Sequence, residues 1–399
     1  MFKERIKTHH SAMADSKQYA RGMCNLVEAM QNPEGAENNA VIYIHVPFCT
    51  KICTFCNMRR SLQRPASNYA DTIVQEILEY AKLPYVQKTV FDAVYFGGGT
   101  PTTLKIEDFR KILQALKKSF TFTEQAEFSV ETTVTQLTKE KWEALIEEGV
   151  TRFSVGVQTF YDAGRKLMGR IGSGEKAYEL LRKLKETGVT VSMDLIYNYP
   201  GQSIEDLYVD LDKIIELDLD GFSMYSLIDM KETTIDQAQG MENDEEMFYA
   251  ISDYMSKAGY HFLELTKMVK NDRYQYIMNR HRGADTLPLG AGAGGSLHGI
   301  AMMNPIKLEE YEESVVQFKE RRGMAFDPEY KEITRFKGDI QTVFLPRNTK
   351  LYKDYAEYEA LLDKLIIEDM VKKEEDVYRL TTKGVFWGNT ISRTLSALL

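Results

Sequence analysis

The chain has 399 residues, of which 43% are hydrophobic and 27% are charged, and its formal net charge is −9. This length is enough for a sizeable core and favours two domains over one. The acidic balance argues against a general nucleic-acid or membrane-surface binder, because such proteins carry an excess of basic residues.

Localisation is inferred from the N-terminus and the cysteines. The opening segment MFKERIKTHHSAMADSK lacks the apolar core of a secretion signal. No apolar run approaches the roughly 20 residues that span a bilayer. Four cysteines do not make a disulfide framework in a chain this long. We therefore expect a cytoplasmic protein, in which clustered cysteines usually bind metal or act in redox chemistry.

The chain is expected to divide into three parts. Residues 1–40 are interpreted as an N-terminal extension, because they end in the linker-like stretch QNPEGAENN. Residues 41–300 are then the main domain, and residues 301–399 a smaller C-terminal domain.

From Val41, short β-rich runs alternate with amphipathic helices. In TKEKWEALIEEG, Thr138 is the expected N-cap and Gly149 the stop, and SIEDLYVDLDKII opens with Ser203 and Asp206 in capping-box spacing. This alternation predicts β-α-β units and a parallel sheet. Six strands fall short of the eight of a closed barrel, so we predict an α/β fold with a partial (β/α)6 TIM-like barrel, its strands at 41–46, 91–97, 127–132, 152–158, 189–196 and 221–227.

The C-terminal domain is predicted to be α+β. Residues 355–399 have the pattern of a helix, a short hairpin in MVKKEEDVYRLT, and a final helix, which is the outline of a winged-helix-like unit. Because the chain is acidic, we expect no nucleic-acid partner for this unit.

Three of the four cysteines, Cys49, Cys53 and Cys56, lie in YIHVPFCTKICTFCNMRR with C-x3-C-x2-C spacing. A structural zinc ion takes four protein ligands, and a four-iron cluster held by protein alone takes four thiolates. Cys24 precedes the predicted linker and is interpreted as a free thiol. One metal position is therefore left for a ligand that is not protein. The alternative is a zinc loop completed by a distant histidine.

A glycine-rich motif, YFGGGTP (95–101), falls at the carboxyl end of the second predicted strand, where barrel sites form. Its glycines would let the backbone approach a ligand closely, although a tight strand–helix turn also explains the motif by itself. Polar residues recur at later strand ends, which suggests a lined cavity because buried parallel strands are mostly apolar; they are Glu131, Gln158, Arg170 and Asp194.

A second glycine motif matches the dinucleotide fingerprint G-x-G-x-x-G at Gly290, Gly292 and Gly295. Pro288 disfavours the strand that should precede such a fingerprint. We therefore predict no nicotinamide site, and interpret the loop as a flexible wall beside a substrate cavity.

Taken in order, these motifs resemble those of the HemN/HemW-type radical S-adenosylmethionine (SAM) proteins. The stretches GVTRFSVGVQTF, MGR, DLIYNYPGQ, MYSL and LTTKG extend the resemblance over about residues 41–390. It implies a [4Fe-4S] cluster on Cys49, Cys53 and Cys56, with SAM on the open iron, Phe55 shielding the cluster, and two SAM molecules. It also implies contacts to SAM from Tyr43, Gly98, Gly99, Thr100, Glu131, Gln158, Arg170, Asp194 and Ser226.

Departures from the motifs separate the branches of this family. The coproporphyrinogen dehydrogenase pattern has Gly and Cys where this chain has Asn57 and Met58. The haem-chaperone branch carries His-Asn-x-x-Tyr-Trp, and KNDRYQY lacks its histidine. DTLPLGAGAGGSLHG instead resembles the haem-utilisation branch, the HutW, ChuW and HmuW type of anaerobilin synthase. A haem chaperone, a coproporphyrinogen dehydrogenase and a methyltransferase for another planar aromatic substrate stay as alternatives.

The resemblance to that branch implies a radical SAM C-methyltransferase that degrades haem anaerobically. A 5′-deoxyadenosyl radical would take hydrogen from the methyl group of a second SAM. The resulting methylene radical would attack a meso carbon of haem, giving a linear tetrapyrrole and free iron. Electrons would come from flavodoxin or ferredoxin.

Residues toward haem are predicted less directly. His298 adjoins the glycine-rich loop and joins Glu131 and Arg170 as a catalytic candidate, whereas His45 is expected to organise the SAM site. For each candidate, an ordinary structural or solvent-facing histidine is the more common explanation. The possible haem ligands or proton donors are His261, His281 and His298, and the possible cations for the propionates are Arg59, Arg60, Arg64, Arg280 and Arg282.

Overall fold

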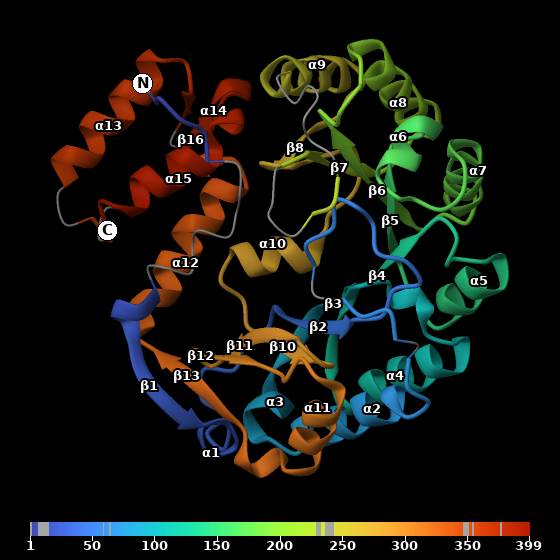
Figure 1. The fold of residues 1–399 in the computed structure, drawn as a ribbon. Helices are drawn as coiled ribbons and strands as arrows, with labels where there is room; N and C mark the ends of the chain where they lie inside the picture. Colours follow the sequence, from blue (N-terminus) through green and yellow to red (C-terminus); the bar gives the residue numbers. More distant parts are fainter. Residues whose placement is uncertain are drawn as a thin grey trace.

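The computed structural model describes residues 2–6, 16–58, 60–63, 65–228, 233–235, 243–345, 351–352, 355–375 and 377–399. Figure 1 shows parallel strands curving around α10 (Gln275–His281), with helices on the outside. The main sheet has the order β1-β13-β12-β11-β10-β2-β3-β4-β5-β6-β7-β9-β8, and a small antiparallel sheet has the order β14-β16-β15.

The six predicted strands are confirmed as the parallel core of the main sheet. They are β2 (Ala40–Val46), β3 (Val90–Gly98), β4 (Thr121–Thr133), β5 (Arg152–Gln158), β6 (Thr190–Tyr197) and β7 (Gly221–Ser226). The helices around them are α2 (Tyr69–Tyr80), α3 (Pro84–Lys88), α4 (Ile106–Ser119), α5 (Lys139–Glu147), α6 (Asp162–Leu167), α7 (Gly174–Lys185), α8 (Ile204–Glu216) and α9 (Asp244–Lys257).

Local signals place the helix starts as predicted. The Thr138 side chain accepts a hydrogen bond from the Lys141 N–H at the start of α5. At α8, Ser203 and Asp206 form both bonds of the capping box. Such caps satisfy backbone N–H groups that have no partner inside the helix.

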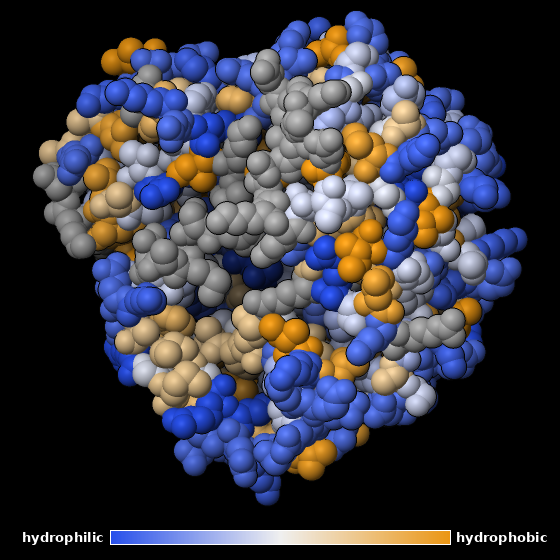
Figure 2. All heavy atoms as spheres, in the orientation of Figure 1, coloured by the Kyte–Doolittle hydropathy of each residue, from blue (hydrophilic) through white to orange (hydrophobic). Residues whose placement is uncertain are grey.

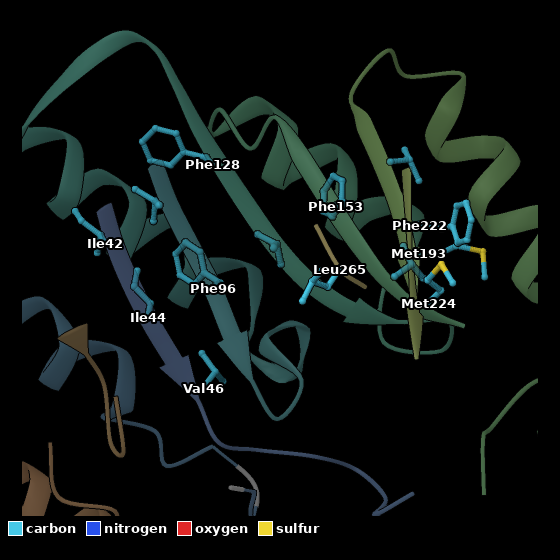
Figure 3. Packing of buried hydrophobic residues seen from close by; sticks show 14 of the residues in the cluster. Ile42, Ile44, Val46, Phe96, Phe128, Phe153, Met193, Phe222, Met224 and Leu265 are labelled. Carbon is cyan, nitrogen blue, oxygen red and sulfur yellow. The ribbon is translucent and has the colours of Figure 1, made fainter. Parts of the chain in front are cut away.

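The core lies between the strands and the outer helices. Ile42, Ile44 and Val46 alternate along β2 and are fully buried, as are Phe96 and Phe153 on β3 and β5 (Figure 3). Since successive strand residues point to opposite faces, the residues between them face the barrel interior. That interior is polar: the Tyr95 hydroxyl donates to Glu131, and Arg152 pairs with Asp272.

Further strands widen the sheet beyond the six. They are β1 (Ala20–Asn25), β8 (His261–Glu264), β9 (Lys267–Val269), β10 (Thr286–Leu289), β11 (Gly294–Leu297), β12 (Ile300–Met303) and β13 (Arg322–Phe326), with α1 (Leu26–Ala29), α11 (Leu308–Val316) and α12 (Pro328–Gln341). β1 pairs with β13. The main sheet therefore runs across both expected boundaries, at residues 40 and 300, and the domain division stays a prediction.

The prediction that Pro288 prevents a strand was wrong. Pro288 lies in β10, opposite Tyr43 of the parallel strand β2. β11 joins the other side of β10 at Thr286, before the proline, so the ladder there does not need the N–H that proline lacks. The last glycine of the fingerprint, Gly295, lies in strand β11 rather than at the start of the helix that a dinucleotide site requires.

The glycine-rich loop is also not a flexible wall. Residues 289–293 are buried. The Gly290 N–H donates to Glu76 Oε2 at 2.9 Å, and the Ala291 N–H donates to the Tyr69 hydroxyl at 3.0 Å. These contacts pack the loop against α2 and the end of β2.

The C-terminal unit contains the predicted helix, hairpin and final helix. Its elements are β14 (Phe344–Leu345), α13 (Tyr355–Ile367), β15 (Val371–Glu374), β16 (Val377–Leu380), α14 (Thr382–Phe386) and α15 (Gly388–Ser396). The α/β partial barrel with a small C-terminal sheet is thus confirmed. Among the described residues, no helix combines the length and apolar character needed to cross a membrane.

Candidate active site

The cysteine loop leaves the carboxyl end of β2 and is fixed by backbone bonds. The Ser61 N–H donates to Pro47 O at 2.7 Å, and the Cys49 N–H donates to Ser61 O at 2.8 Å. The Thr54 hydroxyl donates to the Leu167 carbonyl at the end of α6, at 2.9 Å. The loop is therefore held from both sides, at the end of the barrel where sites form.

The three cysteines and the strand ends line one cavity of about 180 Å³, called here the cysteine cavity. Most of the polar residues predicted from the strand ends are brought together with the thiols at this cavity. Its lining includes Cys49, Cys53, Cys56, Phe55, Gly98, Gly99, Thr100, Glu131, Gln158, Arg170 and Asp194.

The donors fit an iron–sulfur cluster with one open iron. All three thiols are free, and burial raises the pKa of Cys49 and Cys56. In the described part of the chain, no three His, Cys, Asp or Glu side chains gather around a point as a single metal ion needs. A four-iron cluster needs wider spacing, because each thiolate binds a different iron.

Arg170 and Gln158 are among the side chains at this cavity that carry unused polar atoms. Arg170 donates from Nη1 to Cys53 Sγ at 3.2 Å and from Nη2 to the Gly156 carbonyl. Arg170 Nε and Gln158 Oε1 are buried without a hydrogen-bond partner among the described residues. Since buried polar atoms are normally paired, these two fit a site completed by a polar ligand.

Two glycines of the GGG motif, Gly98 and Gly99, lie too close to their neighbours for another residue. Gly98 has a φ of +112°, and a Cβ there would lie 2.6 Å from His45 Cε1. A Cβ at Gly99 would lie 2.7 Å from the Phe48 carbonyl oxygen. The glycines therefore let β3 turn tightly against the start of the cysteine loop.

Glu131 is a buried carboxyl group that can exchange a proton near neutral pH. Burial raises its pKa to about 7, despite hydrogen bonds from the Tyr95 hydroxyl at 2.6 Å and the Gly98 N–H at 3.3 Å. Burial also raises the pKa of Asp194. Tyr95 was missed by the sequence reasoning, although its place two residues before Gly97 puts it on the inward face of β3.

A second, larger cavity of about 410 Å³ adjoins the first, called here the apolar cavity. The two share Phe55, Met58, Gly98, Glu131, Gln158 and Asp194. Figure 2 shows a hollow near the centre of a mostly polar face. The lining of the apolar cavity also includes Ser226, Arg5 and Asn389 and the apolar side chains of Ile196, Met224, Leu227, Phe248, Leu265 and Phe386.

Tyr43 and His45 lie next to these cavities on β2. The Tyr43 hydroxyl is 2.8 Å from His45 Nδ1, and its ring stacks on Tyr276 of α10. Tyr43 is not among the residues that line either cavity in the described part of the chain. Its contact with SAM stays a prediction.

The structure does not bring His298 to this site, which corrects its choice as a catalytic candidate. His298 follows β11 at the amino end of the parallel strands: its N–H donates to Asp285 Oδ2, and the Asp285 carbonyl accepts from Val41 at the start of β2. The cysteines follow the other end of β2. His298 was chosen because it adjoins the glycine-rich loop in sequence. That choice failed because β11 runs antiparallel to β10 and returns the chain to the amino end of the parallel strands.

The other candidates toward haem are scattered. His261 lies on β8 beside a separate small cavity, and His281 bonds Glu264 at 2.7 Å. Arg60 lines the cysteine cavity, whereas Arg280 contacts the Tyr276 hydroxyl. Arg282 is the C-cap of α10, and Arg59 and Arg64 lie outside the described residues. The remaining cysteine, Cys24, lies on β1, where its Sγ contacts the Gly323 carbonyl.

Comparisons with known proteins indicate the radical SAM superfamily. Residues 43–214 match the model of the radical SAM superfamily. The chain is 27% identical to the anaerobilin synthase of Escherichia coli O157:H7, over 93% of this chain and 87% of that protein. It is 29% identical to the haem chaperone HemW of Lactococcus lactis, over 69% of this chain and 73% of that protein.

One solved structure matches almost the whole chain. The structure of coproporphyrinogen III oxidase (HemN) from Escherichia coli, a radical SAM enzyme, superposes with a TM-score of 0.77. The match covers 94% of this chain and 93% of that one at 24% identity. At that identity the match shows a common fold, including the C-terminal unit.

Proposed function

Because the chain is a radical SAM enzyme of the HemN/HemW type, we propose that it opens haem without oxygen. A carbon from SAM is added to a meso carbon of haem, the macrocycle opens to a linear tetrapyrrole, and the iron is released. The likeness to an anaerobilin synthase along 93% of the chain supports this choice over the other activities of the family.

The residues of the cysteine cavity would hold the cofactors. Cys49, Cys53 and Cys56 would bind the [4Fe-4S] cluster, and the backbone of Gly98 and Gly99 would lie against SAM. When bound, these groups supply a carbon radical through one-electron cleavage of SAM. We propose a second SAM molecule, and flavodoxin or ferredoxin as the electron donor.

The chain's own groups orient the ligands and control protons. Arg170 directs positive charge at Cys53 Sγ, and its buried Nε is ready for a ligand oxygen or nitrogen. Glu131 can hold or release a proton at the border of the two cavities, because burial has raised its pKa to about 7. Phe55 lines both cavities and excludes water between the cysteines and the substrate.

The observation that carries the proposal is the adjoining apolar cavity. Its volume of about 410 Å³ lies in the usual range for organic ligands, roughly 300–1,000 Å³. Its walls are mostly aliphatic and aromatic, which suits a flat macrocycle. Because it shares Gly98, Glu131 and Asp194 with the cysteine cavity, a bound substrate would lie beside SAM.

The test is an anaerobic turnover assay with the reconstituted protein. Haem, SAM carrying a 13C-labelled methyl group, and reduced flavodoxin are added, and the haem absorbance is followed. We expect loss of the Soret band, release of 5′-deoxyadenosine, and a linear tetrapyrrole with one labelled carbon by mass spectrometry. Cys53→Ser serves as the inactive control.

Three other results would contradict haem opening. Haem that stays intact while SAM is cleaved would indicate another substrate. Stoichiometric haem binding without loss of colour would favour a haem chaperone, the function named for the HemW relative. Release of carbon dioxide from coproporphyrinogen would favour the activity named for the HemN structure.

A further inference from the structure

The N-terminal residues 2–6 lie across the C-terminal unit. The ring of Phe2 is 5.7 Å from that of Trp387, and the Ile6 N–H donates to Thr390 Oγ1 at 2.9 Å. Figure 1 shows this end of the chain beside α14 and β16. These contacts bring Arg5 to the wall of the apolar cavity.

Arg5 is mostly buried there and keeps an unused donor. Its guanidinium carbon is 3.9 Å from the ring centre of Phe386, which lines the same cavity. Its Nη1 is 3.1 Å from Asp244 Oδ2, and its side chain is 16% exposed. Arg5 Nε is buried with no hydrogen-bond partner among the described residues.

The Asp244 carboxylate is shared with a second group. Tyr197 donates its hydroxyl proton to Asp244 and accepts a hydrogen bond from Ser226; burial, followed by the charge of Asp244, raises the Tyr197 pKa. A chain of polar contacts therefore runs along the cavity wall from Ser226 to Arg5. A ligand carboxylate could bind Arg5 while Asp244 still accepts the hydrogen bond from Tyr197.

The charges of the cavity give a ligand its orientation. Among the described residues that line the apolar cavity, Arg5 alone is positively charged, and Glu131 and Asp194 are acidic. The two acids lie where this cavity meets the cysteine cavity. Within the apolar cavity, a ligand carboxylate is therefore attracted to the Arg5 wall, whereas the cations Arg60 and Arg170 line the cysteine cavity.

We propose that Arg5 binds a carboxylate of the ligand in the apolar cavity, which rests on the proposed function of that cavity as the substrate site. A guanidinium matches a carboxylate with two parallel hydrogen bonds. Exclusion of water strengthens such a contact. The carboxylate is either a propionate of haem or the amino-acid carboxylate of SAM.

The test measures binding and needs no turnover. Haem and its dimethyl ester, in which both propionates are blocked, are titrated by absorbance into the cluster-free full-length protein. SAM binding is measured separately by calorimetry on the reconstituted protein. The variants are Arg5→Gln, Arg5→Lys and Asp244→Asn, with Lys3→Gln as a matched control because Lys3 is exposed on the same segment.

For a propionate, Arg5→Gln weakens haem binding about tenfold and leaves binding of the ester unchanged. Arg5→Lys keeps part of the affinity. Asp244→Asn tightens haem binding, because it removes the competing carboxylate, so the two changes act in opposite directions even if Arg5→Gln also loosens the fold. Lys3→Gln binds haem like the parent protein.

Selective weakening of SAM binding by Arg5→Gln would instead assign the carboxylate to SAM. Unchanged affinity for both haem and SAM in Arg5→Gln, or equal losses for haem and its ester, overturns the role of Arg5. A parent protein that binds no haem overturns the proposed function of the cavity, and the SAM measurement then decides the role of Arg5.

Discussion

At the residue scale, Glu131 shows how burial and hydrogen bonding compete over one proton. Burial penalises the carboxylate, while the Tyr95 hydroxyl and the Gly98 N–H stabilise it. The effect of burial is larger than that of the two hydrogen bonds, and the pKa of Glu131 rises from 4.5 to about 7. A carboxyl group with this pKa can hold or release a proton near neutral pH at the border of the two cavities.

This shift predicts a pH dependence of stability. Because the folded pKa lies above the unfolded value, Glu131 contributes stability that is complete below pH 4.5 and lost as the pH rises through about 7. The difference corresponds to about 3 kcal/mol. We expect Glu131→Gln, which cannot titrate, to remove that loss when urea unfolding of the cluster-free protein is followed across the window. Parallel pH curves for the two proteins would contradict the assignment.

The cysteines give a second prediction at this scale. Cys53 lines the cysteine cavity, whereas Cys24 lies on β1 beside the Gly323 carbonyl. We expect Cys53→Ser to lose the visible absorption, iron and sulfide of the reconstituted cluster. Cys24→Ser is the matched control and should reconstitute like the parent protein. Equal iron in both variants would exclude the three-cysteine site.

At the element scale, β10 and the loop after it show that neighbouring strands decide which structure a glycine-rich motif adopts. Pro288 is tolerated because of where β11 joins β10. Gly290 then turns with a φ of +91°, directly against β2. What looked in sequence like a flexible wall is a buried corner that holds β2 in place below the cysteine loop.

This corner predicts unequal costs for two glycine substitutions. A Cβ at Gly290 would lie 2.4 Å from the His45 carbonyl oxygen, whereas at Gly188, with a φ of +81°, it would meet no described atom within 4 Å. Gly188→Ala should cost about 1 kcal/mol of unfolding free energy for the backbone conformation. Gly290→Ala should cost at least about 2 kcal/mol more. Chemical denaturation measures both, and equal costs would mean that the corner relaxes freely.

At the scale of the whole molecule, a buried charge cluster closes the polar interior of the barrel. Arg152 of β5 pairs with Asp272 at 2.9 Å, and Lys267 of β9 reaches the same carboxylate at 3.1 Å. These side chains are at most 1% exposed. The cluster therefore joins the central strand β5 to β9 and to the segment that follows β9.

We expect Asp272→Asn to destabilise the protein by about 3–5 kcal/mol, because it removes the carboxylate that both buried cations contact directly. The matched control is Glu310→Gln, whose ion pair with Lys307 is 55% and 74% exposed and should contribute much less to stability than the buried cluster. Urea unfolding of both variants gives the comparison. A loss below about 1 kcal/mol for Asp272→Asn would show that solvent or rearrangement replaces the carboxylate.

The sequence by itself determined the parallel strands, the helix caps at Thr138 and Ser203, and the crowding of three cysteines behind the first barrel strand. These features depend on hydrophobic periodicity and on side chains that hydrogen-bond to the backbone a few residues away. They can therefore be predicted from a short stretch of sequence. The sequence also predicted that the side chains at the strand ends lie together, since the carboxyl ends of parallel strands meet on one side of the sheet. That is why Glu131, Gln158 and Asp194 could be named together.

The tertiary structure alone decided which distant residues share a wall. His298 lies at the opposite end of the barrel from the cysteines, and Pro288 lies inside a strand. Arg5 lies beside Phe386 and Asp244. Each outcome depends on the partner of a strand or on the docking of a terminal segment. Such contacts join residues far apart in the chain, and no local pattern encodes them because their free energy comes from surfaces that meet only after folding.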